Sequence, residues 1–285
     1  MPNYDTKPTK TYKSKKPFQE LNLEDNFMFA KVMSNTEILR KTLSLLLSKN
    51  IMKVEFVESE KTIENSPETK GSRLDVYATD ENGEIYNIEM QTGRKDNIFK
   101  RSRYYQGNID IGLLPKGAKY TSLRKTYIIF ICTFDLFGKG RHIYPFGAYC
   151  KLDKTIFLDD GAERVFVNTR GTMEDVSPEV TQFLKYIENS TEEMTAGYDF
   201  LRNLHAEVQK IRSNKEMEMR YMTMPMREDD IRYETEIETR LEAAVDFIAE
   251  FGIQATKALR TLKLPEDMLS ELRQLLDERG VKYQI

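Results

Sequence analysis

A hairpin signal in the first third of the chain constrains the fold more than any other feature. Residues 73–78 and 85–91 largely alternate apolar and polar side chains, which is the pattern of β-strands. The turn between them is Asp-Glu-Asn-Gly (residues 80–83), and Asn-Gly is among the strongest hairpin-turn sequences because both residues readily adopt positive φ. The sequence therefore predicts two antiparallel strands over residues 73–91.

Helical and strand patterns flank this hairpin. Residues 21–47 and 97–114 carry apolar side chains at helical spacing. Residues 126–134 form a continuous apolar run of strand length, which is typical of a strand buried on both faces. Further strand candidates are residues 54–57, 156–158 and 164–168. Strands and helices in this order predict an α/β core.

The character of the sequence differs at the two ends of this core. Residues 1–20 are rich in Lys, Thr and Pro, which predicts a disordered basic tail. After Pro178 the chain becomes charged and helical in pattern, with a last pair of helical segments near residues 238–252 and 265–278. We therefore expect three parts: a tail over residues 1–20, a core over 21–175 and a helical appendage over 176–285.

The residues that are scarce exclude several kinds of active site. The 285 residues include only two His and two Cys, and these lack the spacing of a zinc site or of a nucleophile with its base. The glycine-rich nucleotide-binding motifs are also missing. If the chain is an enzyme, carboxylates must do the chemistry. No apolar run approaches the ~20 residues that span a bilayer, so we expect a cytoplasmic protein that does not enter the membrane.

Asp75 and Glu89 are the candidate catalytic acids. In the predicted hairpin they can lie near each other across the strand pair, since alternate side chains share a face. Their oxygens would suit Mg²⁺ or Mn²⁺, and such an ion can polarise a phosphate and lower the pKa of bound water. Asp25, near the start of the first predicted helix, could supply a third carboxylate. The alternative is that these acids simply face solvent.

A basic segment directly follows the predicted hairpin. Residues 91–125 contain nine Lys or Arg against two acids, although the net charge of the chain is −3. A phosphate-binding surface beside the acids would need such a segment, whereas the alternative is an ordinary solvated helix face. The candidate phosphate contacts are Lys70, Arg73, Arg94 and Lys95.

Three runs of the sequence together resemble a known family. These are L-D-V-Y-A-T-D-E-N-G-E-I-Y-N-I-E-M-Q (residues 74–91), F-K-R-S-R-Y-Y (99–105) and G-A-K-Y-T-S-L-R-K-T-Y-I-I-F-I (117–131). They resemble the Rpn family of recombination-promoting nucleases, often described as transposases, within the PD-(D/E)XK nuclease superfamily. The segment L-N-L-E-D-N-F-M-F-A-K-V (21–32) is similar to the first helix of that family. The likeness spans roughly residues 21–175.

The resemblance implies a restriction-endonuclease-like fold, in which helices flank a central mixed sheet. It also implies that Asp75 and Glu89 are metal ligands and that Asp25 stands at the acidic position of the first helix. Gln91 would stand where the superfamily has its motif lysine. A glutamine brings no positive charge and cannot act as a general base, but it can orient the attacking water.

The resemblance places Arg101 and Tyr104 on the helix beside the site. With Arg103 they join the four phosphate contacts as candidate DNA-binding residues, and the tyrosine ring could stack on a base.

The implied activity is that of a Mg²⁺- or Mn²⁺-dependent DNA endonuclease linked to recombination or mobile elements. A homodimer is expected, because a domain with one site usually needs two copies to cut a duplex. Two alternatives remain open. Gln91 and the acidic appendage favour a non-catalytic DNA-binding or assembly protein on a degenerate nuclease fold. The third possibility is a metal-dependent hydrolase of RNA or of another phosphodiester.

Overall fold

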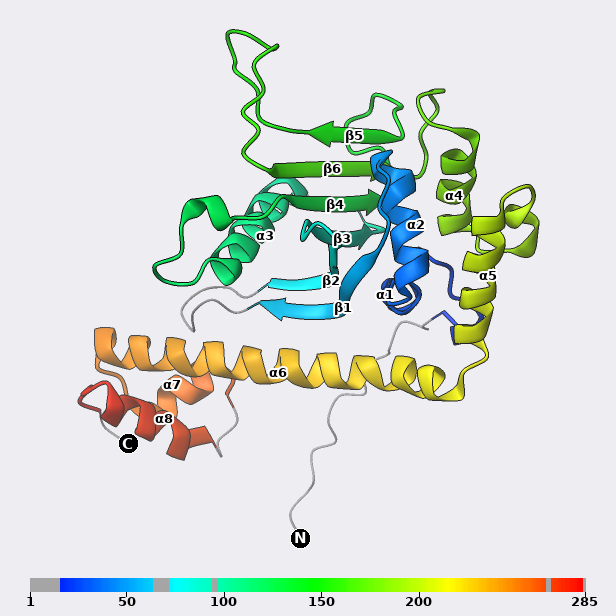
Figure 1. Cartoon of the computed structure of the whole chain (residues 1–285). Coiled ribbons are helices and arrows are strands. Elements are labelled where there is room, and N and C mark those ends of the chain that lie inside the picture. Colours follow the sequence, from blue (N-terminus) through cyan, green and yellow to red (C-terminus); the bar gives the residue numbers. More distant parts are fainter. Residues whose placement is uncertain (1–15, 64–71, 94–96, 265–267, 284–285) are drawn as a thin grey trace. The chain divides into compact units, whose positions relative to one another are not determined.

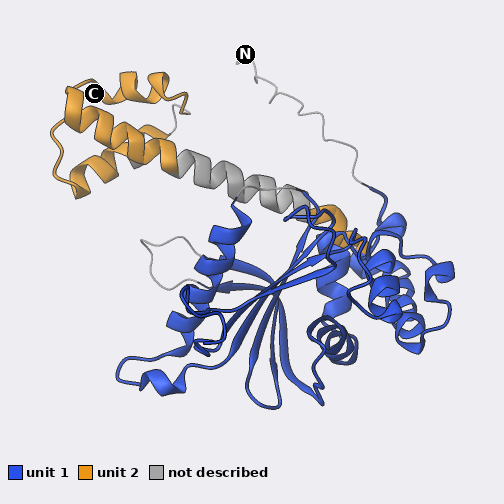
Figure 2. Cartoon of the chain, turned by 90° about the horizontal axis from the view of Figure 1, so that it is seen from above, with its two compact units in different colours: residues 1–217 blue, residues 218–285 orange. Residues whose placement is uncertain are grey.

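The computed structural model describes residues 16–63, 72–93, 97–264 and 268–283, and it leaves the side chains of 224–238 and 271 undescribed. The chain forms two compact units, residues 1–217 and 218–285 (Figure 2). Helices cover both faces of the sheet of the first unit (Figures 1 and 2).

A mixed sheet of six strands forms the centre of the first unit in the described part of the chain (Figure 1). The order is β1-β2-β3-β4-β6-β5, where β3, β4 and β6 run parallel and the other neighbours are antiparallel. The strands are β1 (Val54–Ile63), β2 (Ser72–Asp80), β3 (Ile85–Gln91), β4 (Thr126–Cys132), β5 (Ile143–Phe146) and β6 (Ala162–Asn168). The expected α/β fold with a central mixed sheet is confirmed.

Details of the sheet near its β5 edge differ from the expectation. Residues 156–158 form no strand, and only Phe157 makes an isolated bridge, to Tyr149. The edge strand β5 was not expected, because it has four residues and contains Pro145. A proline is tolerated at a sheet edge, where its missing N–H costs no ladder bond.

The hairpin signal corresponds to β2 and β3, which pair from Thr79↔Ile85 to Val76↔Ile88. Gly83 in the turn adopts a φ of 74°, which a residue with a side chain rarely does. The Asp80 carboxylate closes the turn, because it accepts the backbone N–H groups of Asn82 and Glu84 at 2.9 Å each.

The helices of the first unit are α1 (Asn26–Met33), α2 (Thr36–Leu47), α3 (Ile98–Leu113), α4 (Pro178–Glu188) and α5 (Asp199–Arg212). The expectation of one helix over residues 21–47 is wrong, because the chain breaks between α1 and α2 at Asn35. The Asn35 side chain caps α2 by accepting the N–H groups of Glu37 and Ile38. Apolar spacing continues across the break, so the periodicity alone did not reveal it.

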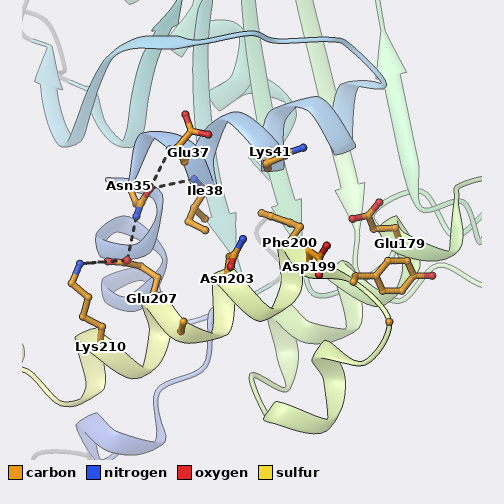
Figure 3. A pocket seen from close by; sticks show the side chains of 13 residues that line it. Asn35, Glu37, Ile38, Lys41, Glu179, Asp199, Phe200, Asn203, Glu207 and Lys210 are labelled. Atoms are coloured by element: carbon orange, nitrogen blue, oxygen red, sulfur yellow. Dashed lines mark hydrogen bonds and ion pairs between the residues drawn. The ribbon is translucent and has the colours of Figure 1, made fainter.

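Asn35 also joins α2 to α5. Its side-chain nitrogen donates to Glu207 at 3.1 Å, and Figure 3 shows both residues beside a surface groove of about 600 Å³. This groove contains neither Asp75 nor Glu89.

Replacing Asn35 with Ala should lower the free energy of unfolding by about 1–2 kcal/mol, because the α2 cap and the bond to Glu207 are lost together. Urea denaturation measures the change. Asn203→Ala is a matched control, since Asn203 is exposed in the same groove. Equal stability of the two variants would contradict the assigned role of Asn35.

Helices α4 and α5 lie within the compact unit that holds the sheet. Their inner faces are buried, with Phe183, Leu184 and Leu201 fully enclosed. The structure thus divides the chain near residue 217, whereas the sequence suggested a core over 21–175 and an appendage over 176–285. Apolar residues of a docked helix and of a separate bundle follow the same period, so spacing could not place this division.

The start of the described chain also belongs to the first unit. Phe18–Glu20 form a short 3-10 helix, η1, in which Phe18 is buried with its ring centroid 6.0 Å from that of Phe27. The expected disordered tail over residues 1–20 is therefore corrected for residues 16–20. Residues 1–15 lie outside the described residues.

The second unit is helical and has its own core. It comprises most of α6 (Lys215–Phe251), α7 (Ala255–Thr261) and α8 (Leu269–Glu278). Its buried side chains include Leu241, Val245, Ile248, Leu259, Leu272 and Leu276. Across the described ranges, the structure contains no helix whose length and hydrophobicity would allow it to span a bilayer.

Candidate active site

The two candidate acids lie where the β2–β3 ladder stops. The last paired residues are Val76 and Ile88, so the next position would set Asp75 opposite Glu89. After the Val76–Ile88 pair, side-chain carboxylates replace main-chain carbonyls as the acceptors of the cross-strand N–H groups. The Asp75 N–H donates to Glu89 Oε1 at 3.2 Å, and the Met90 N–H donates to Asp75 Oδ2 at 3.0 Å. The structure thus brings Asp75 and Glu89 together at this point.

Both acids are crowded and withdrawn from water. Glu89 is only 2% exposed, and its pKa is raised to about 8. Burial is the larger cause, and the negative charge of Asp75 is the second. Burial likewise raises the pKa of Asp75, although the Met90 N–H and the Arg101 charge oppose this change. A carboxylate buried beside a second, half-buried carboxylate gains stability from a nearby cation.

Arg101 from α3 is the cation that reaches this pair. Its Nη2 lies 3.3 Å from Glu89 Oε2, and its Nη1 donates to Gln91 Oε1 at 2.8 Å. The hydroxyl of Tyr105 accepts from the same guanidinium at 3.1 Å. The helix α3 therefore connects the acids, the glutamine and a tyrosine in one hydrogen-bonded network.

A basic, partly aromatic cavity of about 610 Å³ lies beside this network. Arg73 and Tyr104 line it, and both are exposed enough to meet a ligand. The full lining is Ser72, Arg73, Asn97, Lys100, Arg101, Arg103, Tyr104 and Tyr105. Four of these residues are cationic, so the cavity suits a polyanion.

Asp25 is held by other partners and is not grouped with the two acids in the described structure. Asp25 accepts from Lys16 at 3.1 Å and from the Asn22 N–H at 2.7 Å, so it fixes the approach to α1. Within the described ranges no three His, Cys, Asp or Glu side chains form a metal-binding group. This corrects the expectation that Asp25 adds a third carboxylate. Lys70, Arg94 and Lys95 lie outside the described residues.

Glu60 on β1 was missed by the sequence reasoning. Its charge contributes to raising the pKa of Asp75, and its own carboxylate pairs with Arg73 at 2.5 Å and with Lys31 at 3.6 Å. Glu60 adopts a φ of 59°, which is unusual for a residue with a side chain within a strand. No sequence signal marks it, since it stands in a polar run of an edge strand.

Asn87 shares a strand face with Glu89 and Gln91, because alternate residues of a strand lie on the same side of the sheet. It is fully buried, and in the described structure its side chain makes no hydrogen bond of normal length. It is nevertheless close enough to lower the pKa of Glu89. A buried polar group in this state commonly marks a place where water or an ion completes the coordination.

The residues present fit a divalent cation. Mg²⁺ binds proteins through oxygen ligands, often one or two carboxylates, and keeps several of its waters. Asp75 and Glu89 supply two carboxylates from neighbouring strands, and the charge of Asp75 helps to raise the pKa of Glu89. These two residues would hold the ion.

A mixed sheet flanked by helices, with paired acids where two antiparallel strands part, is the architecture of a restriction-endonuclease-like core. Residues 26–251 match the family model of the PD-(D/E)XK nuclease family transposases, which covers most of the chain. The chain belongs to this family, and the resemblance seen in the sequence is confirmed. No match was found among curated proteins or among solved structures. Family membership supports a nuclease-type function and implies a DNA substrate.

Proposed function

We propose that the chain is a Mg²⁺- or Mn²⁺-dependent DNA endonuclease in which Asp75 and Glu89 hold the cation. The observation that carries the proposal is the approach of the buried Glu89 carboxylate and the half-buried Asp75 carboxylate beside a basic cavity. When bound, the ion would polarise the scissile phosphate and promote ionisation of the attacking water.

The other residues of the site position the substrate. Arg73 and Arg103 would bind backbone phosphates of the substrate, because both line the cavity and are exposed. Tyr104, which is 39% exposed, offers a ring on which a base can stack. Gln91 fixes the geometry near Glu89, since its amide is held by Arg101 on one side and by the Gly93 carbonyl on the other.

Cleavage of supercoiled plasmid by the purified full chain tests the proposal. We expect nicked and linear products with Mg²⁺ or Mn²⁺ and none in EDTA. Duplex DNA, single-stranded DNA and RNA should be compared side by side. Cleavage of RNA alone would show that RNA, and not DNA, is the substrate. Salt-dependent DNA binding without cleavage under any divalent ion would favour the non-catalytic alternative, to which the neutral Gln91 points.

We further propose a cytoplasmic role in recombination or mobile-element movement, in keeping with the transposase description of the family. A homodimer would place two sites on the two strands of a duplex. Sedimentation of the chain alone and with duplex DNA tests this assembly. A monomer that still linearises plasmid in one binding event would contradict it.

Replacing Arg103 with Ala should weaken DNA binding about equally for all sequences and reduce the slope of log affinity against log salt by about 1. The reason is the loss of one exposed phosphate contact in the cavity lining. Fluorescence anisotropy over a salt series measures it. Lys116→Ala is the control, because Lys116 is exposed but outside the cavity. An unchanged slope for Arg103→Ala would remove this residue from the DNA-binding surface.

A further inference from the structure

We infer that Arg101 supplies, from α3, the positive charge that Gln91 lacks, and that it is the catalytic residue that contacts the scissile phosphate. The inference rests on the proposed nuclease function and specifies one part of its site. A lysine at position 91 would carry a cation on the same strand as Glu89, whereas a glutamine amide is neutral. The charge must therefore come from another element.

Arg101 reaches both motif residues of β3 at once. Its two terminal nitrogens lie 2.8 Å from Gln91 Oε1 and 3.3 Å from Glu89 Oε2. Gln91 is oriented for this contact, because its own nitrogen donates to the Gly93 carbonyl at 2.6 Å and its oxygen faces the guanidinium. A lysine at position 91 would repel that guanidinium. A glutamine on β3 and an arginine on α3 are therefore chemically matched.

The guanidinium is held on one side and open on the other. The Tyr105 hydroxyl accepts a hydrogen bond from Arg101 Nη2 at 3.1 Å. The Cζ atom of Arg101 lies 5.3 Å from the centroid of the Phe130 ring. Aromatic faces attract a guanidinium and fix its plane. A quarter of the side chain remains exposed and lines the basic cavity with Arg73. A phosphate in this cavity would meet a cation whose plane is already fixed.

A purely structural role would also place a cation here, as a counter-ion for two crowded carboxylates. The two roles make different demands. A counter-ion is required for folding, with or without DNA. A phosphate contact affects DNA binding and cleavage, and its charge can be supplied again from position 91.

The test compares wild type with Arg101→Ala, with Gln91→Lys, and with the double variant Gln91→Lys/Arg101→Ala. Plasmid cleavage with Mg²⁺ gives the rate, anisotropy of a labelled duplex in EDTA gives the affinity, and thermal melting reports folding. We expect Arg101→Ala to lower the rate by about a hundredfold and the affinity by about tenfold. The double variant should recover both to within about tenfold of wild type. Arg103→Ala, on the same helix, is the control that Gln91→Lys should not rescue.

An Arg101→Ala variant that binds DNA as wild type does would overturn the inference. So would a double variant that melts like wild type yet recovers neither affinity nor rate. If Arg101→Ala does not fold, Arg101→Lys and Arg101→Gln replace it, and only the lysine variant should keep its affinity. A wild type that binds DNA without cutting it would end the proposed function, and the affinity series would then decide the role of Arg101 alone.

Discussion

Asp75→Asn or Glu89→Gln should lower the cleavage rate by at least about a thousandfold. This effect is expected to exceed the rate loss that follows from removing one transition-state hydrogen bond. Each change replaces one oxygen with an amide nitrogen and keeps the shape, but it removes half of the negative charge that would hold the cation. Plasmid cleavage measures the rate, and calorimetric titration with Mn²⁺ should show that binding is lost in parallel.

The control for these variants is Glu55→Gln. Glu55 is an exposed acid on β1 that pairs only with Lys53 at 2.9 Å in the described structure, so its loss should leave both rate and Mn²⁺ binding unchanged. Normal cleavage by both Asp75→Asn and Glu89→Gln would end the assignment of the site. Normal Mn²⁺ binding with lost cleavage would place the ion elsewhere.

Asp80→Ala should lower the free energy of unfolding by about 3 kcal/mol, the second large effect. The Asp80 side chain is fully buried and serves several partners at once. It accepts the two turn N–H groups and the Tyr86 hydroxyl at 2.8 Å, and it lies 3.7 Å from the Lys49 ammonium. Removing it leaves the two turn N–H groups without their side-chain acceptor, whereas the Tyr86 hydroxyl and the Lys49 ammonium keep the Glu84 carboxylate as a partner. Urea denaturation measures the loss.

Asp80→Asn separates the turn from the charge. Asparagine can still accept the two backbone N–H groups but carries no charge for Lys49, so this variant should lose only part of the stability. Cleavage should also fall in Asp80→Ala, since the register of β2 and β3 sets the position of the acids. A loss below about 1 kcal/mol would show that the turn sequence alone holds the hairpin.

Local patterns predicted the parts of the fold that depend on neighbours in sequence. The β2–β3 hairpin and the buried strand β4 follow from alternation, an Asn-Gly turn and a continuous apolar run. β1 was expected to end at residue 57, but it continues to Ile63. The prediction missed the second half of this edge strand because its side chains are mostly half-buried and show no apolar period. Packing, rather than local pattern, decides such elements.

In the site, too, local sequence patterns predicted some contacts, and tertiary packing determines the others. Asp75 and Glu89 could be paired from the hairpin alone, because their register follows from the turn. The contact of Arg101 with Gln91 depends on how α3 lies on the sheet, and ten residues of separation do not determine that. Asp25 was placed near the acids by its position at the start of a helix and by the resemblance of that helix to the first helix of the family. Its partners Lys16 and Asn22 precede that helix, and no periodic signal reveals them.

The cross-strand N–H bonds to both acids have a consequence for turnover. Main-chain atoms of opposite strands, and not free rotamers, set the distance between the two carboxylates. The conformational entropy needed to place the two carboxylates is therefore lost when the chain folds, before any substrate binds. Damage to the sheet that leaves the protein folded should accordingly slow catalysis long before it lowers the melting temperature.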